Sequence, residues 1–138
     1  MTEPKQVTKF PPPQQGERVT YTGSCHCNAV VYQITHCKLE ENEVVTCNCS
    51  ICTRNGYLFI YAPPEDFEFV TGSDNILTKY KFHKMNSAHY FCPRCGTSIF
   101  AVSEAAEFFP GYRGVNVRTL HDVDISKLNL VHLDGKSF

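Results

Sequence analysis

The alternation of apolar and polar positions along the chain predicts a mostly β fold. Short runs rich in β-branched and aromatic residues recur from Tyr21 onward, and Gly, Pro, Asn or Asp separates them. The strands that this pattern predicts are residues 29–34, 58–61, 67–70, 77–82, 89–91 and 98–102. No long window carries the 3.6-residue apolar period of an amphipathic helix, so we expect at most a helical turn near residues 103–107.

The two ends of the chain have different patterns. Residues 1–18 are polar and contain three consecutive prolines from Pro11, so we interpret them as a flexible N-terminal lead, with a polyproline ligand for a partner domain as the alternative. Residues 19–138 are expected to form a single domain. Near the C-terminus, Leu128, Leu130 and Leu133 alternate with polar positions, which suits a strand that closes a sheet edge.

Charge and hydropathy narrow the functional classes. The net charge is −1 and no basic run is present, which makes nucleic acid an unlikely partner. No apolar run approaches the roughly 20 residues of a membrane span. The N-terminus lacks the apolar segment of a secretory signal, so we expect a cytoplasmic or nuclear protein. Thiols in those compartments stay mostly reduced, and clustered cysteines there indicate metal or catalytic sites.

Seven of the eight cysteines fall into three clusters. Cys25 and Cys27 lie two residues apart, so on an extended backbone both thiols face the same side. Cys92 and Cys95 form a C-x-x-C turn followed by a glycine, as in zinc knuckles. Joining the two pairs gives four thiolates, which predicts a closed, structural zinc site.

The middle cluster supplies Cys47, Cys49 and Cys52 and has no obvious fourth ligand. Three protein ligands and one open position are typical of a zinc ion that binds a substrate or water. We therefore predict a second, functional zinc here, which makes two zinc ions per chain. Arg54 lies two residues further on and either offsets the local negative charge or is an ordinary surface arginine.

Other interpretations of the cysteines remain open at this point. Disulfides would require an oxidising compartment, an iron–sulfur cluster would also use four cysteines, and buried structural cysteines would be scattered along the chain. Cys37 is isolated and is expected to be a small core residue or a free thiol. His26 and His89 are expected to be strand residues beside a site rather than ligands.

The three ordered clusters, from Gly23 to Cys27, from Cys47 to Cys52 and from Phe91 to Gly96, resemble the glutathione-dependent formaldehyde-activating enzyme and centromere protein V family. The resemblance covers about residues 20–120. It implies a mostly β fold of the β-tent type, with antiparallel sheets around a four-cysteine zinc site. It also implies that Cys25, Cys27, Cys92 and Cys95 are the structural ligands and that Cys47, Cys49 and Cys52 bind the functional zinc.

The activity that this resemblance implies is that of a carbon–sulfur lyase, which condenses formaldehyde with glutathione to S-hydroxymethylglutathione. The thiol partner would be glutathione, and Arg54, Asn55 and Tyr57 are candidates, by proximity alone, for the group that stabilises the developing alkoxide. The alternative is a non-enzymatic zinc-binding interaction module. The chain departs from the family at Leu120-His121-Asp122, where members commonly carry a Leu-Asp-Asp-Pro-like stretch.

Overall fold

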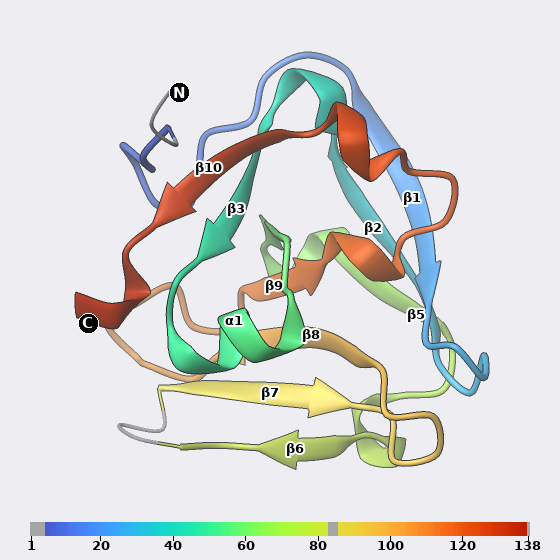
Figure 1. The fold of residues 1–138 in the computed structure, drawn as a ribbon. Helices are drawn as coiled ribbons and strands as arrows, with labels where there is room; N and C mark the ends of the chain where they lie inside the picture. Colours follow the sequence, from blue (N-terminus) through green and yellow to red (C-terminus); the bar gives the residue numbers. More distant parts are fainter. Residues whose placement is uncertain (1–4, 83–85, 138) are drawn as a thin grey trace.

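The structure is a computed structural model that describes residues 5–82 and 86–137, and it is mostly β as predicted. A three-stranded sheet has the order β1-β2-β5, and a seven-stranded sheet has the order β10-β3-β4-β9-β8-β7-β6 (Figure 1). The strands are β1 Arg18–Ser24, β2 Val31–Cys37, β3 Glu43–Cys47, β4 Phe59–Ala62, β5 Phe67–Thr71, β6 Thr78–Tyr80, β7 Ser87–Phe91, β8 Ser98–Ser103, β9 Arg113–Asn116 and β10 Asn129–Leu133. The described residues contain one short α-helix, α1 (Ser50–Asn55), of about one and a half turns.

The seven-stranded sheet presents two different faces because successive side chains of a strand point to opposite sides. On one face, Ile60, Phe100 and Val115 are buried in the core that the sheet shares with the three-stranded sheet. On the other face, Tyr61 and Ala101 belong to a second, smaller apolar cluster that also contains the cysteines of the middle motif. This second face forms the floor of the cavity described below.

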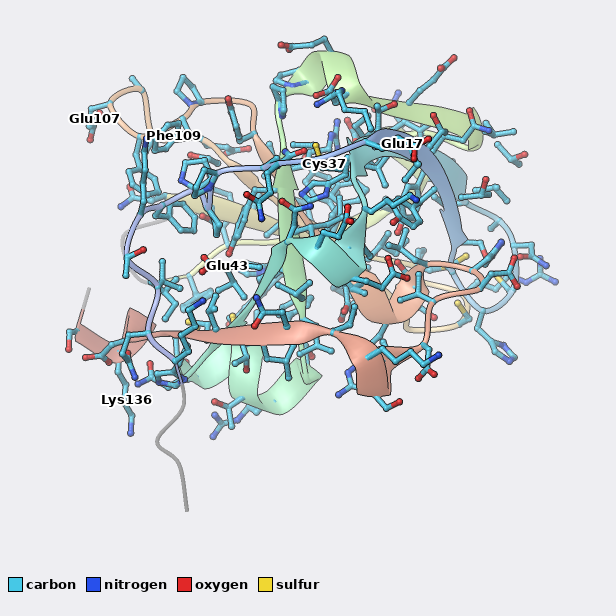
Figure 2. The ribbon with its side chains drawn as sticks, turned by 90° about the horizontal axis from the view of Figure 1, so that it is seen from above. Glu17, Cys37, Glu43, Glu107, Phe109 and Lys136 are labelled. Atoms are coloured by element: carbon cyan, nitrogen blue, oxygen red, sulfur yellow. The ribbon has the colours of Figure 1, made fainter. Side chains whose placement is uncertain are left out.

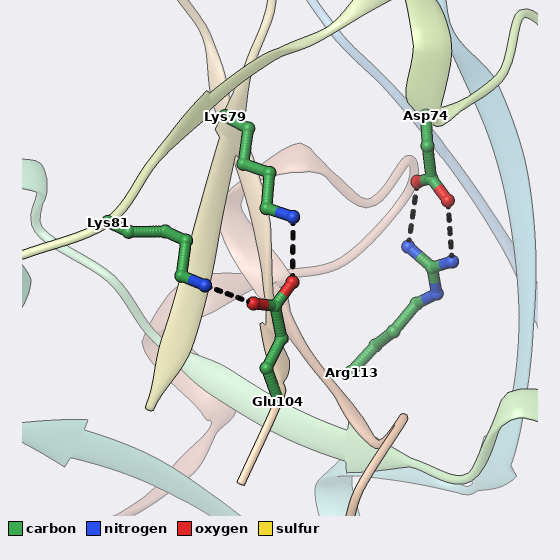
Figure 3. A network of polar contacts seen from close by, with 5 residues as sticks. All are labelled: Asp74, Lys79, Lys81, Glu104 and Arg113. Carbon is green, nitrogen blue, oxygen red and sulfur yellow. Dashed lines mark hydrogen bonds and ion pairs between the residues drawn. The ribbon is translucent and has the colours of Figure 1, made fainter. Parts of the chain in front are cut away.

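Two groups of ion pairs, one at Arg113 and one at Glu104, connect strands of this sheet to neighbouring segments (Figure 3). The guanidinium of Arg113 on β9 donates to both carboxylate oxygens of Asp74, at 3.1 and 3.2 Å, and lies 4.5 and 4.6 Å from the centres of two core phenylalanine rings. Glu104, which directly follows β8, pairs with Lys79 at 2.8 Å and with Lys81. The first contact packs β9 against the core, and the second ties β8 to the edge strand β6.

Most of the expected strands are present, and the departures from the sequence analysis have local causes. Strands β1, β3 and β9 and helix α1 were not among the expected elements, because none of these short segments has a clear apolar period. The helical turn expected near residues 103–107 is wrong: β8 extends to Ser103, and a turn follows. No helix in the described ranges is long and apolar enough to cross a lipid bilayer.

The C-terminal segment closes one edge of the seven-stranded sheet through β10. β10 pairs with β3 in parallel, whereas the other strand pairs within the described residues are antiparallel. The N-terminal lead, described from Lys5 onward, runs beside β10 (Figure 1), and Gln6 forms a parallel bridge with His132. The ring of Phe10 then packs edge-on against Tyr61, with the centroids 4.6 Å apart. The flexibility of the lead stays a prediction.

Candidate functional site

Cys25, Cys27, Cys92 and Cys95 come together at one end of the two sheets. The first pair directly follows β1 and the second pair directly follows β7. All four sulfur atoms lie within 4.8 Å of one another, and two of the Sγ–Sγ distances are 3.7 Å. A zinc–sulfur bond of about 2.3 Å places the corners of a tetrahedron about 3.8 Å apart. The four-thiol cluster therefore has the spacing that a tetrahedral metal ion needs.

Backbone and hydroxyl donors hold the four-thiol cluster in place. The amide of Val30 donates to Cys25 Sγ at 3.4 Å. Thr97 Oγ1 accepts from the amide of His26 at 3.2 Å and lies 3.2 Å from Cys95 Sγ, where its hydroxyl can donate to a thiolate. Gly96 has a φ of +79°, which closes the tight turn after the last cysteine. These donors stabilise negative charge on sulfur, which a metal-binding thiolate requires.

Cys47, Cys49 and Cys52 form the three-thiol cluster, whose sulfur atoms also lie within 4.8 Å of one another. Cys47 is the last residue of β3, Cys49 is the N-cap of α1, and Cys52 lies in the first turn of that helix. Residues three apart at a helix start lie on the same face, which explains how the last two thiols meet. No histidine, aspartate or glutamate of the described residues completes this group within the same distance.

The segment after β10 packs directly against the three-thiol cluster. A Cβ atom at Gly135 would lie 2.4 Å from Cys47 Sγ, so only glycine fits at this position. Asn48 holds the segment there: its side-chain amide donates to Asp134 at 2.8 Å, and its carbonyl oxygen accepts from the amide of Lys136 at 2.9 Å. The C-terminal turn is thus part of the wall of the cluster.

The thiols of the three-thiol cluster interact strongly with one another. A hydrogen bond from the Cys52 thiol, aided by the backbone amide of Cys49, lowers the pKa of Cys47. The same contact raises the pKa of Cys52, and its burial adds to the effect. The cluster therefore readily carries one thiolate, while further ionisation needs a cation among the sulfur atoms.

A cavity of about 500 Å³ opens beside the three-thiol cluster, and all three of its cysteines line the cavity. None of the cysteines of the four-thiol cluster does. The two cysteine groups thus differ in access: one is closed by its own ligands, and the other faces a space of the size that small-molecule sites have.

Aromatic rings from distant parts of the chain form one side of this cavity. We call them the aromatic wall: Phe10, Tyr61, Phe108, Phe109 and Tyr112. Figure 2 shows Phe109 and Glu107 near one another at the same edge of the molecule. Polar groups reach the cavity from the sheet floor, where Ser87 and His89 on β7 are paired in register with Ser103 and Ala101 on β8.

His89 is the buried imidazole of the cavity lining. Burial lowers its pKa, so the ring is neutral at neutral pH. Its Nδ1 lies 3.4 Å from the hydroxyl of Tyr57, which leaves Nε2 as its second polar atom. The sequence analysis correctly expected His89 to be a strand residue, but it had no signal that this strand face lines a cavity.

The remaining sequence-based candidates lie elsewhere. Arg54 is exposed, its guanidinium donates to the carbonyl of Ser50 at 3.1 Å, and it is not among the described lining residues of the cavity; nor is Asn55. Cys37 is buried and its thiol donates to the carbonyl of Gly16 at 3.5 Å, away from both clusters. All eight cysteines are free thiols.

Two cysteine clusters of unequal access on a mostly β scaffold define a candidate metalloprotein with one closed and one open centre. The model of the glutathione-dependent formaldehyde-activating enzyme family matches residues 20–130, and the chain belongs to that family. The fold is also similar to the crystal structure of a Rhodobacter sphaeroides protein, at 31% identity and a TM-score of 0.65. That similarity covers 80% of this chain and 97% of the other.

The four-thiol cluster predicts a stability defect. Cys92→Ser should release one metal ion per chain and unfold the protein, because three remaining thiolates no longer close the site and metal binding is coupled to folding. Metal content by mass spectrometry and far-UV circular dichroism measure the two effects. The control is Cys37→Ser, which lies outside both clusters and should keep the full metal content. A folded Cys92→Ser protein with unchanged metal content would contradict the assignment.

The close contact of Gly135 with Cys47 predicts that a substitution there affects metal binding only at the three-thiol cluster. Gly135→Ala should lower the metal content by one ion per chain without unfolding the protein, because the new methyl group would displace Cys47 Sγ while the four-thiol cluster persists. Lys136→Ala is the control, since its exposed side chain can be removed while its backbone amide still donates to Asn48. Equal metal content in both variants would show that the contact with Cys47 has no consequence for metal binding.

Proposed function

We propose that the chain is a zinc-dependent enzyme of the carbon–sulfur lyase type that acts on a glutathione adduct such as S-hydroxymethylglutathione. The observation that supports this most is the open three-thiol cluster at the edge of the cavity. Membership of the glutathione-dependent formaldehyde-activating enzyme family supports the same reaction class. Cys25, Cys27, Cys92 and Cys95 would bind the structural zinc, and Cys47, Cys49 and Cys52 the functional zinc.

The reaction is an addition to a carbonyl group. The sulfur of the thiolate forms a bond to the carbonyl carbon, the electron pair of the C=O π bond moves to oxygen, and the oxygen takes up one proton; the reverse reaction breaks the carbon–sulfur bond. The functional zinc would supply the positive charge that keeps the substrate thiol ionised at neutral pH. The cavity walls hold the two reactants side by side and reduce the entropic cost of the bimolecular step.

His89 is our candidate for the group that handles the proton. It lines the cavity as a neutral imidazole, and its Nδ1 is held by the hydroxyl of Tyr57. A neutral imidazole with its proton on Nε2 can pass that proton to the oxygen that becomes negative while Nδ1 takes up another through the hydroxyl of Tyr57, so that the ring stays neutral. Tyr57, one of the three candidates by sequence proximity, would then position His89 rather than touch the substrate.

The function predicts that Cys49→Ser loses activity and keeps its fold. The variant should retain the structural metal and a near wild-type melting temperature, because the four-thiol cluster persists. It should lose binding of glutathione, measured by calorimetry, and exchange between formaldehyde and glutathione, measured by two-dimensional exchange spectroscopy. Cys37→Ser should match the wild type in both measurements.

Two outcomes would contradict the function at different levels. A wild type that neither binds a thiol at millimolar concentration nor speeds exchange above the spontaneous rate would exclude the lyase, and the non-enzymatic interaction module would take its place. An active Cys49→Ser protein would leave the family membership intact and exclude the open zinc as the reactive centre.

The role of His89 predicts a rate defect without metal loss. His89→Phe should lower the exchange rate at saturating glutathione by about 10²-fold or more, which is the usual contribution of a positioned acid or base. The metal content should stay at the wild-type value. His26→Gln, which changes an exposed histidine beside the four-thiol cluster, serves as the control. An unchanged pH profile and rate for His89→Phe would exclude His89 from proton transfer.

A further inference from the structure

The lining of the cavity beside the three-thiol cluster has a larger apolar surface than formaldehyde could cover. Glutathione is strongly polar, since at neutral pH it carries carboxylates and an ammonium group, and formaldehyde adds only a hydroxymethyl group to its sulfur. An adduct of this kind would bring little apolar surface to the cavity. The aromatic wall offers such surface in quantity, which calls for a ligand group that matches it.

The rings of the aromatic wall already pack as a connected surface. Phe10 stacks on Phe108 with the ring centroids 5.4 Å apart and the planes 9° from parallel, and Phe10 also contacts Tyr61 edge-on at 4.6 Å. Phe109 continues the row with an edge-on contact to Tyr112 at 5.4 Å. Each ring therefore supports its neighbour, and the wall is a preorganised apolar surface rather than a set of separate side chains.

Two of these rings remain exposed where the wall meets solvent. Phe108 is 43% exposed and Phe109 is 38% exposed, although both line the cavity. Adjacent exposed phenylalanines at the edge of a cavity are unfavourable in water, and burying them under an apolar ligand group would be favourable by about 25 cal/mol per Å².

The charges that line the cavity also favour an uncharged ligand group. Glu107 is the charged side chain among the described lining residues, and none of those residues is lysine or arginine. The cysteines of the three-thiol cluster add negative charge to the same lining. The carboxylates of glutathione would be repelled from this lining, so they would lie outside it, and the uncharged part of the adduct would occupy the cavity.

We propose that the aromatic wall binds the carbon substituent of the carbonyl partner. The preferred substrate would be a hemithioacetal formed from glutathione and an aldehyde that carries an aromatic or other large apolar group. This inference rests on the proposed function, because it keeps the same thiol and the same addition at the carbonyl carbon. It changes the identity of the aldehyde, from formaldehyde to one with a substituent that fills the cavity.

Two stable thioethers test this substrate class without any turnover. S-benzylglutathione and S-methylglutathione carry identical charges and differ only in the apolar group on sulfur. Calorimetry on the metal-loaded full chain should give a dissociation constant for S-benzylglutathione that is about tenfold or more below that of S-methylglutathione. Phe108→Ala should reduce this preference several-fold. Tyr80→Ala removes an aromatic ring that is exposed but lies outside the cavity lining, and it should keep the preference.

The results separate this inference from the proposed function. Equal affinity for the two thioethers, no measurable binding of either, or an undiminished preference in Phe108→Ala would each overturn the inference. The exchange measurement with formaldehyde and glutathione decides the proposed function independently. If the protein catalyses exchange between formaldehyde and glutathione but binds both thioethers with equal affinity, the proposed function is supported and the apolar substrate class is excluded.

Discussion

Thiolates held within one tetrahedron repel one another unless a cation lies between them, and the arrangement of the two sheets depends on this constraint. In the four-thiol cluster, one pair of cysteines directly follows β1 of the three-stranded sheet and the other pair directly follows β7 of the seven-stranded sheet. The sulfur atoms must come within 4.8 Å of one another for a metal to bind all four. A metal ion at this point would therefore join the ends of two sheets between whose strands no pairing occurs in the described chain. Binding the ion and assembling the sheets would then be coupled, as they are in other structural metal sites.

The same strand that ends in the four-thiol cluster carries the polar floor of the cavity. His89 lies three residues before Cys92, and its partner in register, Ala101, also lines the cavity. Fixing the end of β7 thus fixes the position of His89 relative to β8. The four-thiol cluster would do no chemistry in this arrangement, but with a metal bound it would determine the geometry in which the three-thiol cluster works, as supporting interactions do around metal sites generally.

The sequence predicted the parts of this architecture that local pattern controls. The three cysteine clusters and most strands could be predicted, because ligand spacing and apolar alternation act over a few residues. Helix α1 could not be predicted, since Ser50–Asn55 is too short to show a period; the helix ends at Gly56, which has a φ of +63°. The parallel pairing of β10 with β3 joins residues more than 80 positions apart, and no local pattern specifies it. The cavity was missed for the same reason: it needs Phe10 from the lead, which composition alone marked as loosely attached.

The two clusters differ in their number of cysteines because the chain brings a fourth thiol to one of them and not to the other. In the first centre, the C-x-x-C pair Cys92 and Cys95 follows β7 and completes the set begun by Cys25 and Cys27. In the second, β3 and α1 supply three sulfur atoms, and the next segment to approach is the turn at Gly135, which has no side chain to offer. A larger residue at this position would collide with Cys47, so the close approach that shields one side of the cluster also excludes a protein ligand there. The other side faces the cavity, and no histidine, aspartate or glutamate of the described residues joins the three sulfur atoms there. The backbone around the three-thiol cluster therefore leaves the side toward the cavity free of protein ligands. A metal ion bound by the three sulfur atoms would take its fourth ligand from outside the chain.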